Sequence, residues 1–159
     1  AEGLTRLAAY EPRRVVSDGC ECREGLHAVR IEGGVSGNVV PDRCTIAVNH
    51  RYAPDRTEAE ALAHVQDVLA PFECVLTDSA PAAPPRLTEP AAADFLAAIK
   101  GENQAKLGWT DVSRFASLGI PAVNFGPGDP NLAHTREEYV ELPLIAECER
   151  MLRGYLGGE

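Results

Sequence analysis

One histidine of this sequence, His134, follows a glycine- and proline-rich loop in which metal chemistry could take place. Residues 120–125 form an apolar run that predicts a short buried strand, and Gly126-Pro127-Gly128 closes it. Loops after the carboxyl ends of strands bind ligands in α/β sheets. An imidazole there can hold a metal through one nitrogen. A surface histidine is the alternative, because a catalytic zinc needs three protein ligands and no second candidate has matching spacing.

A second group of polar residues surrounds a turn in front of a short helix, expected over residues 111–118. Thr110 and Asp111 stand where free backbone N–H groups favour an anion or a substrate carboxylate, and Arg114 follows within the first turn. The alternative is that Thr110 or Asp111 only caps the helix. Capping and binding are compatible, so the sequence leaves both open.

A third candidate pairs Asn38 with Arg51. Residues 37–41 form a tight bend that leads into a strand over 43–53, and Arg51 lies on the small, polar face of that strand. A guanidinium there could form a bidentate pair with a carboxylate. An exposed strand arginine is the alternative, and the residues alone favour it slightly.

Glu137 and Glu138 are more typical of a solvated helix start than of a general base.

The elements around Asn38 and Arg51 predict an α+β unit in residues 1–80. A helix should end near Pro12, and strands should follow over 26–35 and 43–53, carrying His27 and His50. Thr57 and Glu60 predict a capping box that opens a helix, on which His64 should be solvated. A last strand is expected over 73–78. This order is a split ferredoxin-like pattern that lacks its opening strand.

The prolines of the segment 81–87 predict an extended linker, and residues 88–159 then read as α/β. Helices are expected over 88–99, 111–118 and from Pro143 onward, with strands over 104–108 and 120–125. Two strands and three helices cannot easily bury both faces of a parallel sheet. We therefore expect this part to complete a larger sheet and to expose apolar helix faces.

Composition excludes several partners. The chain carries 24 acidic and 15 basic residues, a net charge of −9, which gives no electrostatic footprint for nucleic acid or for an anionic membrane surface. No apolar run approaches the length of a membrane span. The 5 scattered cysteines favour free thiols in a reducing cytoplasm.

Taken together, three ordered stretches resemble the dinuclear-zinc amidohydrolases, a family that includes succinyl-diaminopimelate desuccinylases, acetylornithine deacetylases and aminoacylases. The resemblance covers nearly the whole chain and is closest to the desuccinylases. Each stretch alone is a moderate signal, and their order makes the set a strong one. The stretches are Asn38-Val39-Val40-Pro41 with Arg51; Gly108-Trp109-Thr110-Asp111 with Arg114-Phe115; and residues 119–128 followed by Ala133-His134 and Glu138-Tyr139.

The resemblance implies an architecture and partners. Residues 1–80 would be an incomplete lid (dimerisation) domain, and 88–159 would be the C-terminal part of an α/β zinc-hydrolase catalytic domain. The substrate would be a small N-acyl amino acid. Asn38 and Arg51 resemble lid residues that contact substrate from the partner subunit of a homodimer.

The resemblance also implies roles for the second segment. Thr110, Asp111 and Arg114 would bind the substrate, and His134 would ligate one of two zinc ions, for which cobalt can substitute. The family mechanism uses a metal-bridging water that a glutamate base activates for attack on the amide carbonyl.

The departures from the family pattern concern catalysis. The first zinc motif of the family, a histidine, one residue and an aspartate, is absent from the sequence. The bridging aspartate and the glutamate base are expected upstream, so no catalytic residue is assigned to this chain. We expect the chain to begin partway through the first lid helix and to be inactive alone.

Three hypotheses follow. The chain is a piece of a desuccinylase that releases succinate and L,L-diaminopimelate in the lysine and cell-wall pathway. Alternatively, it belongs to a neighbouring deacylase of another acylated amino acid, such as acetylornithine. The third is a non-catalytic dimerisation module, which the missing metal ligands suggest.

Overall fold

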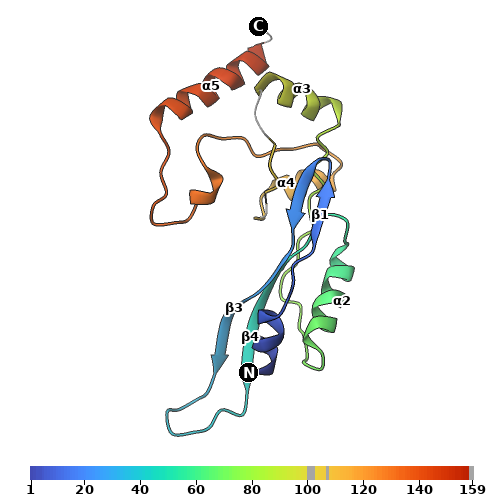
Figure 1. Cartoon of the computed structure of the whole chain (residues 1–159), viewed down its shortest axis with the longest axis vertical. Coiled ribbons are helices and arrows are strands. Elements are labelled where there is room, and N and C mark those ends of the chain that lie inside the picture. The colour runs from blue at the N-terminus through green and yellow to red at the C-terminus, as the bar shows by residue number, and fades with distance from the viewer. Residues whose placement is uncertain (100–102, 107, 158–159) are drawn as a thin grey trace.

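The computed structural model describes residues 1–99, 103–106 and 108–157, and these form an elongated α+β molecule (Figure 1). Two antiparallel hairpins and two helices make up the first half, and helices dominate the second. The elements are α1 (Glu2–Ala8), β1 (Arg14–Ser17), β2 (Cys20–Arg23), β3 (Gly25–Gly33), β4 (Cys44–Arg51), α2 (Glu58–Leu69), α3 (Pro90–Ile99), α4 (Val112–Ser117), the 3-10 helix η1 (Pro130–Leu132) and α5 (Leu142–Gly157).

The long β3–β4 hairpin is the central element of the first half. Its register runs from Gly25 opposite Arg51 to Gly33 opposite Cys44, with one irregularity between Ala28 and Arg30. From Thr45 to the end of β4, exposed and half-buried residues alternate, as expected of a strand covered on one face. The strands predicted over 26–35 and 43–53 are therefore confirmed, each slightly shorter than expected.

A small apolar core fills the angle between this hairpin and the two helices. Leu7 of α1, Leu26 of β3 and Leu69 of α2 are its buried members, and half-buried residues such as Ile46 and Val65 pack around them. Burying each leucine contributes roughly 1.5–3 kcal/mol. The three contacts fix α1 and α2 against the same face of the hairpin.

The capping box at the start of α2 is confirmed. The Thr57 hydroxyl accepts from the Glu60 backbone N–H at 3.2 Å, and the Glu60 carboxylate accepts from the Thr57 N–H at 2.8 Å. Two backbone donors that lack helical partners are thus satisfied. The helix ends at Leu69, two residues before Pro71, a residue type that cannot continue a helix.

The hairpin of β1 and β2 was not predicted. Its two turn residues, Asp18 and Gly19, both have positive φ (48° and 78°), which is typical of an Asp-Gly hairpin turn. The sequence carries this signal, but each strand has only 4 residues. The first helix also ends earlier than expected, at Ala8 rather than near Pro12.

Other predicted strands do not form. Residues 73–78 and 120–125 have no strand partner, and Ile120 is 46% exposed rather than buried. A strand satisfies its backbone only beside another strand, and the described part of the chain offers none to these segments. Of the strand expected over 104–108, residues 104–106 are unpaired and residue 107 lies outside the described residues.

Helices of the second half form as predicted. α3, α4 and α5 correspond to the helices expected over 88–99, over 111–118 and from Pro143. Phe95 of α3 meets Tyr155 of α5 and Phe125 edge-on, with ring centroids 5.1 and 5.4 Å apart. Yet α5 has no buried residue among those described. The predicted exposure of apolar helix faces is confirmed.

This exposure predicts self-association of the isolated chain. Leu142 and Leu156 on α5 are 78% and 79% exposed, and apolar patches left in water drive association. The chain should show a concentration-dependent mass in sedimentation velocity. Changing both leucines to Gln should reduce that mass without lowering the melting temperature, whereas Glu141→Gln, a polar change at the same helix end, should not. A single monomeric species at every concentration would contradict this expectation.

Candidate functional site

An open cavity of about 470 Å³ lies beside the start of α4. One wall comes from the turn before the helix and from the helix itself, and the other comes from the extended segment over residues 122–124. Three polar residues line this cavity. Thr110 and Asp111 were predicted to bind substrate, and Asn124 was not. The full lining is Trp109, Thr110, Asp111, Val112, Phe115, Ala122, Val123 and Asn124.

Thr110 is held across the cavity by Asn124. The Asn124 side-chain amide donates to the Thr110 hydroxyl oxygen at 3.2 Å, and this bond joins segments 14 residues apart. Asp111 occupies the N-cap position of α4, but its side chain makes no capping hydrogen bond. A purely capping role, the alternative for these residues, therefore finds no support in the hydrogen bonding.

Arg114 is oriented by two weak contacts. Its Nε lies 3.7 Å from the Asp111 carboxylate, and its guanidinium carbon lies 5.5 Å from the centroid of the Trp109 ring. Both charged side chains are about three-quarters exposed, so the ion pair contributes little to stability. Arg114 also borders a second cavity of about 430 Å³, opposite residues 78–81 of the connector.

His134 lies on the loop between η1 and α5. Its φ is +66°, and its backbone N–H donates to the Glu138 carboxylate at 2.9 Å. The histidine is exposed. Glu138 thus closes a loop rather than starting a helix, because α5 begins only at Leu142, and the expectation of a helix start at Glu137 and Glu138 was wrong.

The described residues do not assemble a metal centre by themselves. Within residues 1–99, 103–106 and 108–157, no three His, Cys, Asp or Glu side chains gather closely enough to hold an ion. A catalytic zinc needs about three protein ligands. His134 can offer one imidazole, so this chain fits a metal only as a contributor of one ligand.

Asn38 and Arg51 belong to the β3–β4 hairpin. Asn38 lies in the turn between the strands, where its side chain accepts from the Ser36 hydroxyl at 2.6 Å, and Arg51 is exposed at the other end of β4. In Figure 1 that turn lies at one extremity of the molecule, and α3 and α5 lie at the other. Among the described side chains, no hydrogen bond or ion pair joins either residue to the cavity beside α4.

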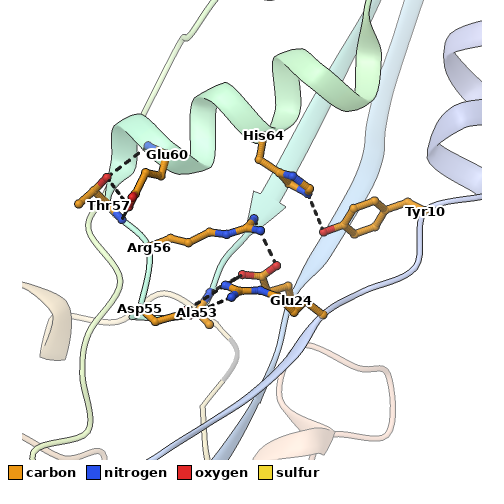
Figure 2. A network of polar contacts seen from close by, with 9 residues as sticks. Tyr10, Glu24, Ala53, Asp55, Arg56, Thr57, Glu60 and His64 are labelled. Atoms are coloured by element: carbon orange, nitrogen blue, oxygen red, sulfur yellow. Dashed lines mark hydrogen bonds and ion pairs between the residues drawn. The ribbon is translucent and has the colours of Figure 1, made fainter.

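The densest polar cluster lies elsewhere, around Glu24 (Figure 2). The Glu24 carboxylate is fully buried, accepts from Arg13 at 2.8 Å and from the Ala53 N–H at 3.2 Å, and lies 3.5 Å from Arg56. Burial alone would raise the pKa of Glu24, but the bonds to Arg13 and to the Ala53 N–H outweigh it and lower that pKa. Arg13 also holds Asp55 at 2.7 Å and lowers its pKa.

Two histidines face each other beside this cluster. The rings of His50 on β4 and His64 on α2 have centroids 5.5 Å apart, and His64 Nε2 shares a hydrogen bond with the Tyr10 hydroxyl at 3.2 Å. His64 is half-buried rather than solvated as predicted, because Tyr10, just after α1, and His50 on β4 lie against it. Both ring nitrogens of His50 are buried and find no hydrogen-bond partner in the described part of the chain. Burial lowers the pKa of both histidines.

The sequence of this chain matches a known family almost from end to end. Residues 5–157 match the model of peptidase family M20/M25/M40. The chain belongs to this family. Members of this family are in general metal-dependent hydrolases, and the predicted membership of such a family is confirmed.

Relatives of this M20-family chain carry names that narrow the comparison. It is 55% identical over 157 residues to a putative succinyl-diaminopimelate desuccinylase of Mycobacterium tuberculosis, covering 98% of this chain and 44% of that protein. It is 40% identical over 159 residues to the succinyl-diaminopimelate desuccinylase of Corynebacterium glutamicum (96% and 43%). An acetylornithine deacetylase of Myxococcus xanthus is 27% identical over 135 residues (77% and 34%).

The M20-family chain therefore spans less than half the length of the relatives it matches. None of the helices in its described residues has the length and apolar character needed to cross a bilayer. All five cysteines are free thiols.

The burial of Glu24 predicts that two ion pairs near the β1–β2 hairpin contribute unequally to the free energy of unfolding. Glu24→Ala removes a buried carboxylate and leaves Arg13 and Arg56 facing each other, which should lower the free energy of unfolding by roughly 3 kcal/mol. Glu21→Ala removes only an exposed pair with Arg14 and should cost less than about 1 kcal/mol. Urea unfolding followed by circular dichroism measures both. Equal losses would show that the Glu24 cluster is not a stabilising centre.

The facing histidines predict a loss of stability in mild acid. Their pKa values in the fold lie below the ordinary value of 6.5, so the unfolded chain binds more protons and stability falls as pH drops below about 6.5. The lowered pKa of Glu24 acts only below its ordinary value of 4.5, a separate window. Melting temperatures at pH 7.5 and 5.5 test this.

Two variants locate the effect. His50→Gln should reduce the difference in melting temperature between the two pH values, because one of the facing groups no longer titrates. The exposed His27 on β3 serves as the control, and His27→Gln should leave the difference unchanged. A difference that His50→Gln does not alter would assign the acid sensitivity to other groups.

Proposed function

We propose that this chain is part of a zinc-dependent amidohydrolase that hydrolyses the amide of N-succinyl-L,L-diaminopimelate to succinate and L,L-diaminopimelate. The observation that carries the proposal is the 55% identity to a protein named as a putative succinyl-diaminopimelate desuccinylase, which extends over 98% of the chain. The 40% identity to a second desuccinylase supports it. Lysine and cell-wall biosynthesis in the cytoplasm would be the setting.

The proposal divides the chain into two working parts. Residues 1–80 would form a lid and dimerisation domain of ferredoxin-like type, 81–87 the linker, and 88–159 the end of the catalytic domain. The β3–β4 hairpin packed by α1 and α2 is consistent with a separate first unit. In a homodimer joined through the lid, Asn38 and Arg51 would reach the substrate of the partner subunit.

The second part would bind substrate and contribute to the metal site. Thr110 and Asp111 line the cavity beside α4, and Arg114 borders the second cavity, with Trp109 lining both. A hydroxyl and a guanidinium placed in this way would hold the carboxylates of an N-acyl amino acid. His134 would give one ligand to a zinc or cobalt ion. The remaining ligands and the general base would come from the rest of a longer protein, since the described residues hold no cluster of three ligands.

A related deacylase is the second candidate. The 27% identity to an acetylornithine deacetylase favours it, and Arg51 and Thr110 suit any carboxylated substrate. A non-catalytic dimerisation module is the third, and it is favoured only by the missing ligands. Tight zinc binding at a defined ratio by this chain alone would count against that third candidate.

Turnover by the full-length protein tests the proposal. With added zinc, it should release succinate from N-succinyl-L,L-diaminopimelate at a kcat/KM well above that for deacetylation of acetylornithine. A preference for acetylornithine would contradict the proposal and favour the second candidate function, a related deacylase. The 159-residue chain alone should release no succinate, and turnover by it would mean that a complete metal site exists here.

One substitution tests the metal role. His134→Ala should lower kcat/KM of the full-length protein by about 100-fold or more, because loss of even a supporting partner in a metal site costs 10–100-fold. His27→Ala, an exposed histidine on β3, should change it less than about twofold, since surface substitutions are nearly neutral. Metal analysis should show less bound zinc for His134→Ala only. Full activity of that variant would remove His134 from the site.

A further inference from the structure

We propose that Asn124 is a positioning residue that holds the Thr110 hydroxyl as a hydrogen-bond donor toward a carboxylate of the substrate. This inference rests on the proposed function, because it takes the cavity beside α4 as the place where an N-acyl amino acid binds. Asn124 lies in the apolar run 120–125, where the sequence gives no signal for a polar role. The contact with Thr110 is visible only in the fold.

The direction of one hydrogen bond carries the argument. The Asn124 amide nitrogen donates to the Thr110 hydroxyl oxygen at 3.2 Å. A hydroxyl has one proton and two lone pairs, so an amide that occupies a lone pair leaves the proton for another acceptor. No protein acceptor for that proton is found among the described residues. Thr110 lines the cavity, so the proton is available to an acceptor bound there.

The apolar residues of the cavity strengthen a hydrogen bond that the Thr110 hydroxyl donates into it. Val112, Phe115, Ala122 and Val123 line the same cavity, and a hydrogen bond beside apolar groups is stronger than one in water. The substrate class follows from the polarity: a hydroxyl that donates its proton into the cavity selects an anion or a carbonyl oxygen. A carboxylate at position 124 would instead accept the Thr110 proton and repel an anionic substrate.

A merely structural role for Asn124 makes a different prediction. The bond could serve only to tie the loop before α4 to the segment 122–124. Asn124 is exposed and Thr110 is half-buried, so losing such a tie should change the melting temperature little and should leave KM unchanged. Substrate affinity therefore separates the two roles.

The experiment is a double-mutant cycle in the full-length protein with N-succinyl-L,L-diaminopimelate. Asn124→Ala should raise KM about tenfold and change kcat less than threefold, a loss typical of one hydrogen bond to a charged group. Thr110→Val should raise KM at least as much, and Thr110→Ser should retain affinity. In the Thr110→Val background, Asn124→Ala should add no further loss. Gln66→Ala, an exposed amide on α2, is the control and should be neutral.

A second variant keeps the test independent of folding. Asn124→Asp is nearly isosteric and reverses the bond, so it should raise KM at least as much as Asn124→Ala while keeping the melting temperature. An unchanged KM in both Asn124 variants would overturn the proposal. So would losses that add fully to that of Thr110→Val.

The wild-type protein separates this proposal from the proposed function. If it hydrolyses acetylornithine instead, the desuccinylase assignment fails, and the same cycle is run with that substrate. If it turns over neither, titration calorimetry with succinate as the probe compares wild type and Asn124→Ala. A roughly tenfold weaker Kd in the variant supports the positioning role, and equal affinities, or no binding to the wild type, overturn it.

Discussion

The buried carboxylate of Glu24 is the constraint on which the first half of this protein depends. It stands between β2 and β3, and its partners come from the residue before β1 and from the connection between β4 and α2. A buried anion is tolerated only when its oxygens are paired, so these segments must meet at one point. The Glu24 backbone N–H, which donates to the Arg13 carbonyl at 2.9 Å, adds a further tie between them. The apolar core of α1, β3 and α2 then packs beside a fixed junction.

Among the described residues of the second half, no buried carboxylate joins the segments in this way, and this difference explains why its cavity is open. α3 and α5 meet through the ring contact of Phe95 with Tyr155, and no described residue of α5 is buried. The cavity beside α4 is correspondingly open, with the polar groups of Thr110 and Asn124 joined across it. An open half-site with one candidate metal ligand suits a chain that spans less than half the length of its relatives.

Local sequence patterns predicted the structure correctly where a segment forms its hydrogen bonds within itself or with one neighbouring strand. The capping box of α2 and the alternation along β4 involve residues close in sequence or a single partner strand, and both formed as predicted. The apolar runs over 73–78 and 120–125 failed as strands because their stability depends on partners that the described residues do not provide. The prediction that His64 is solvated failed for a related reason, since nothing in its own helix reveals that Tyr10 lies against it.

The family and the approximate positions of most helices could be predicted from the amino-acid sequence, because ordered motifs and hydrophobic periodicity are local properties. The residues for substrate and metal binding stay predictions from the same motifs. Which of those residues meet could be seen only in the three-dimensional fold. It joined Asn124 to Thr110, placed Arg114 over Trp109, and left His134 and the Asn38 turn in separate loops. It also placed Glu24 among Arg13, Arg56 and the Ala53 N–H. The physical reason is that hydrogen bonds and ion pairs act over a few ångströms in space, whereas the partners of Glu24 and of Asn124 lie 11 to 32 residues away from them along the chain.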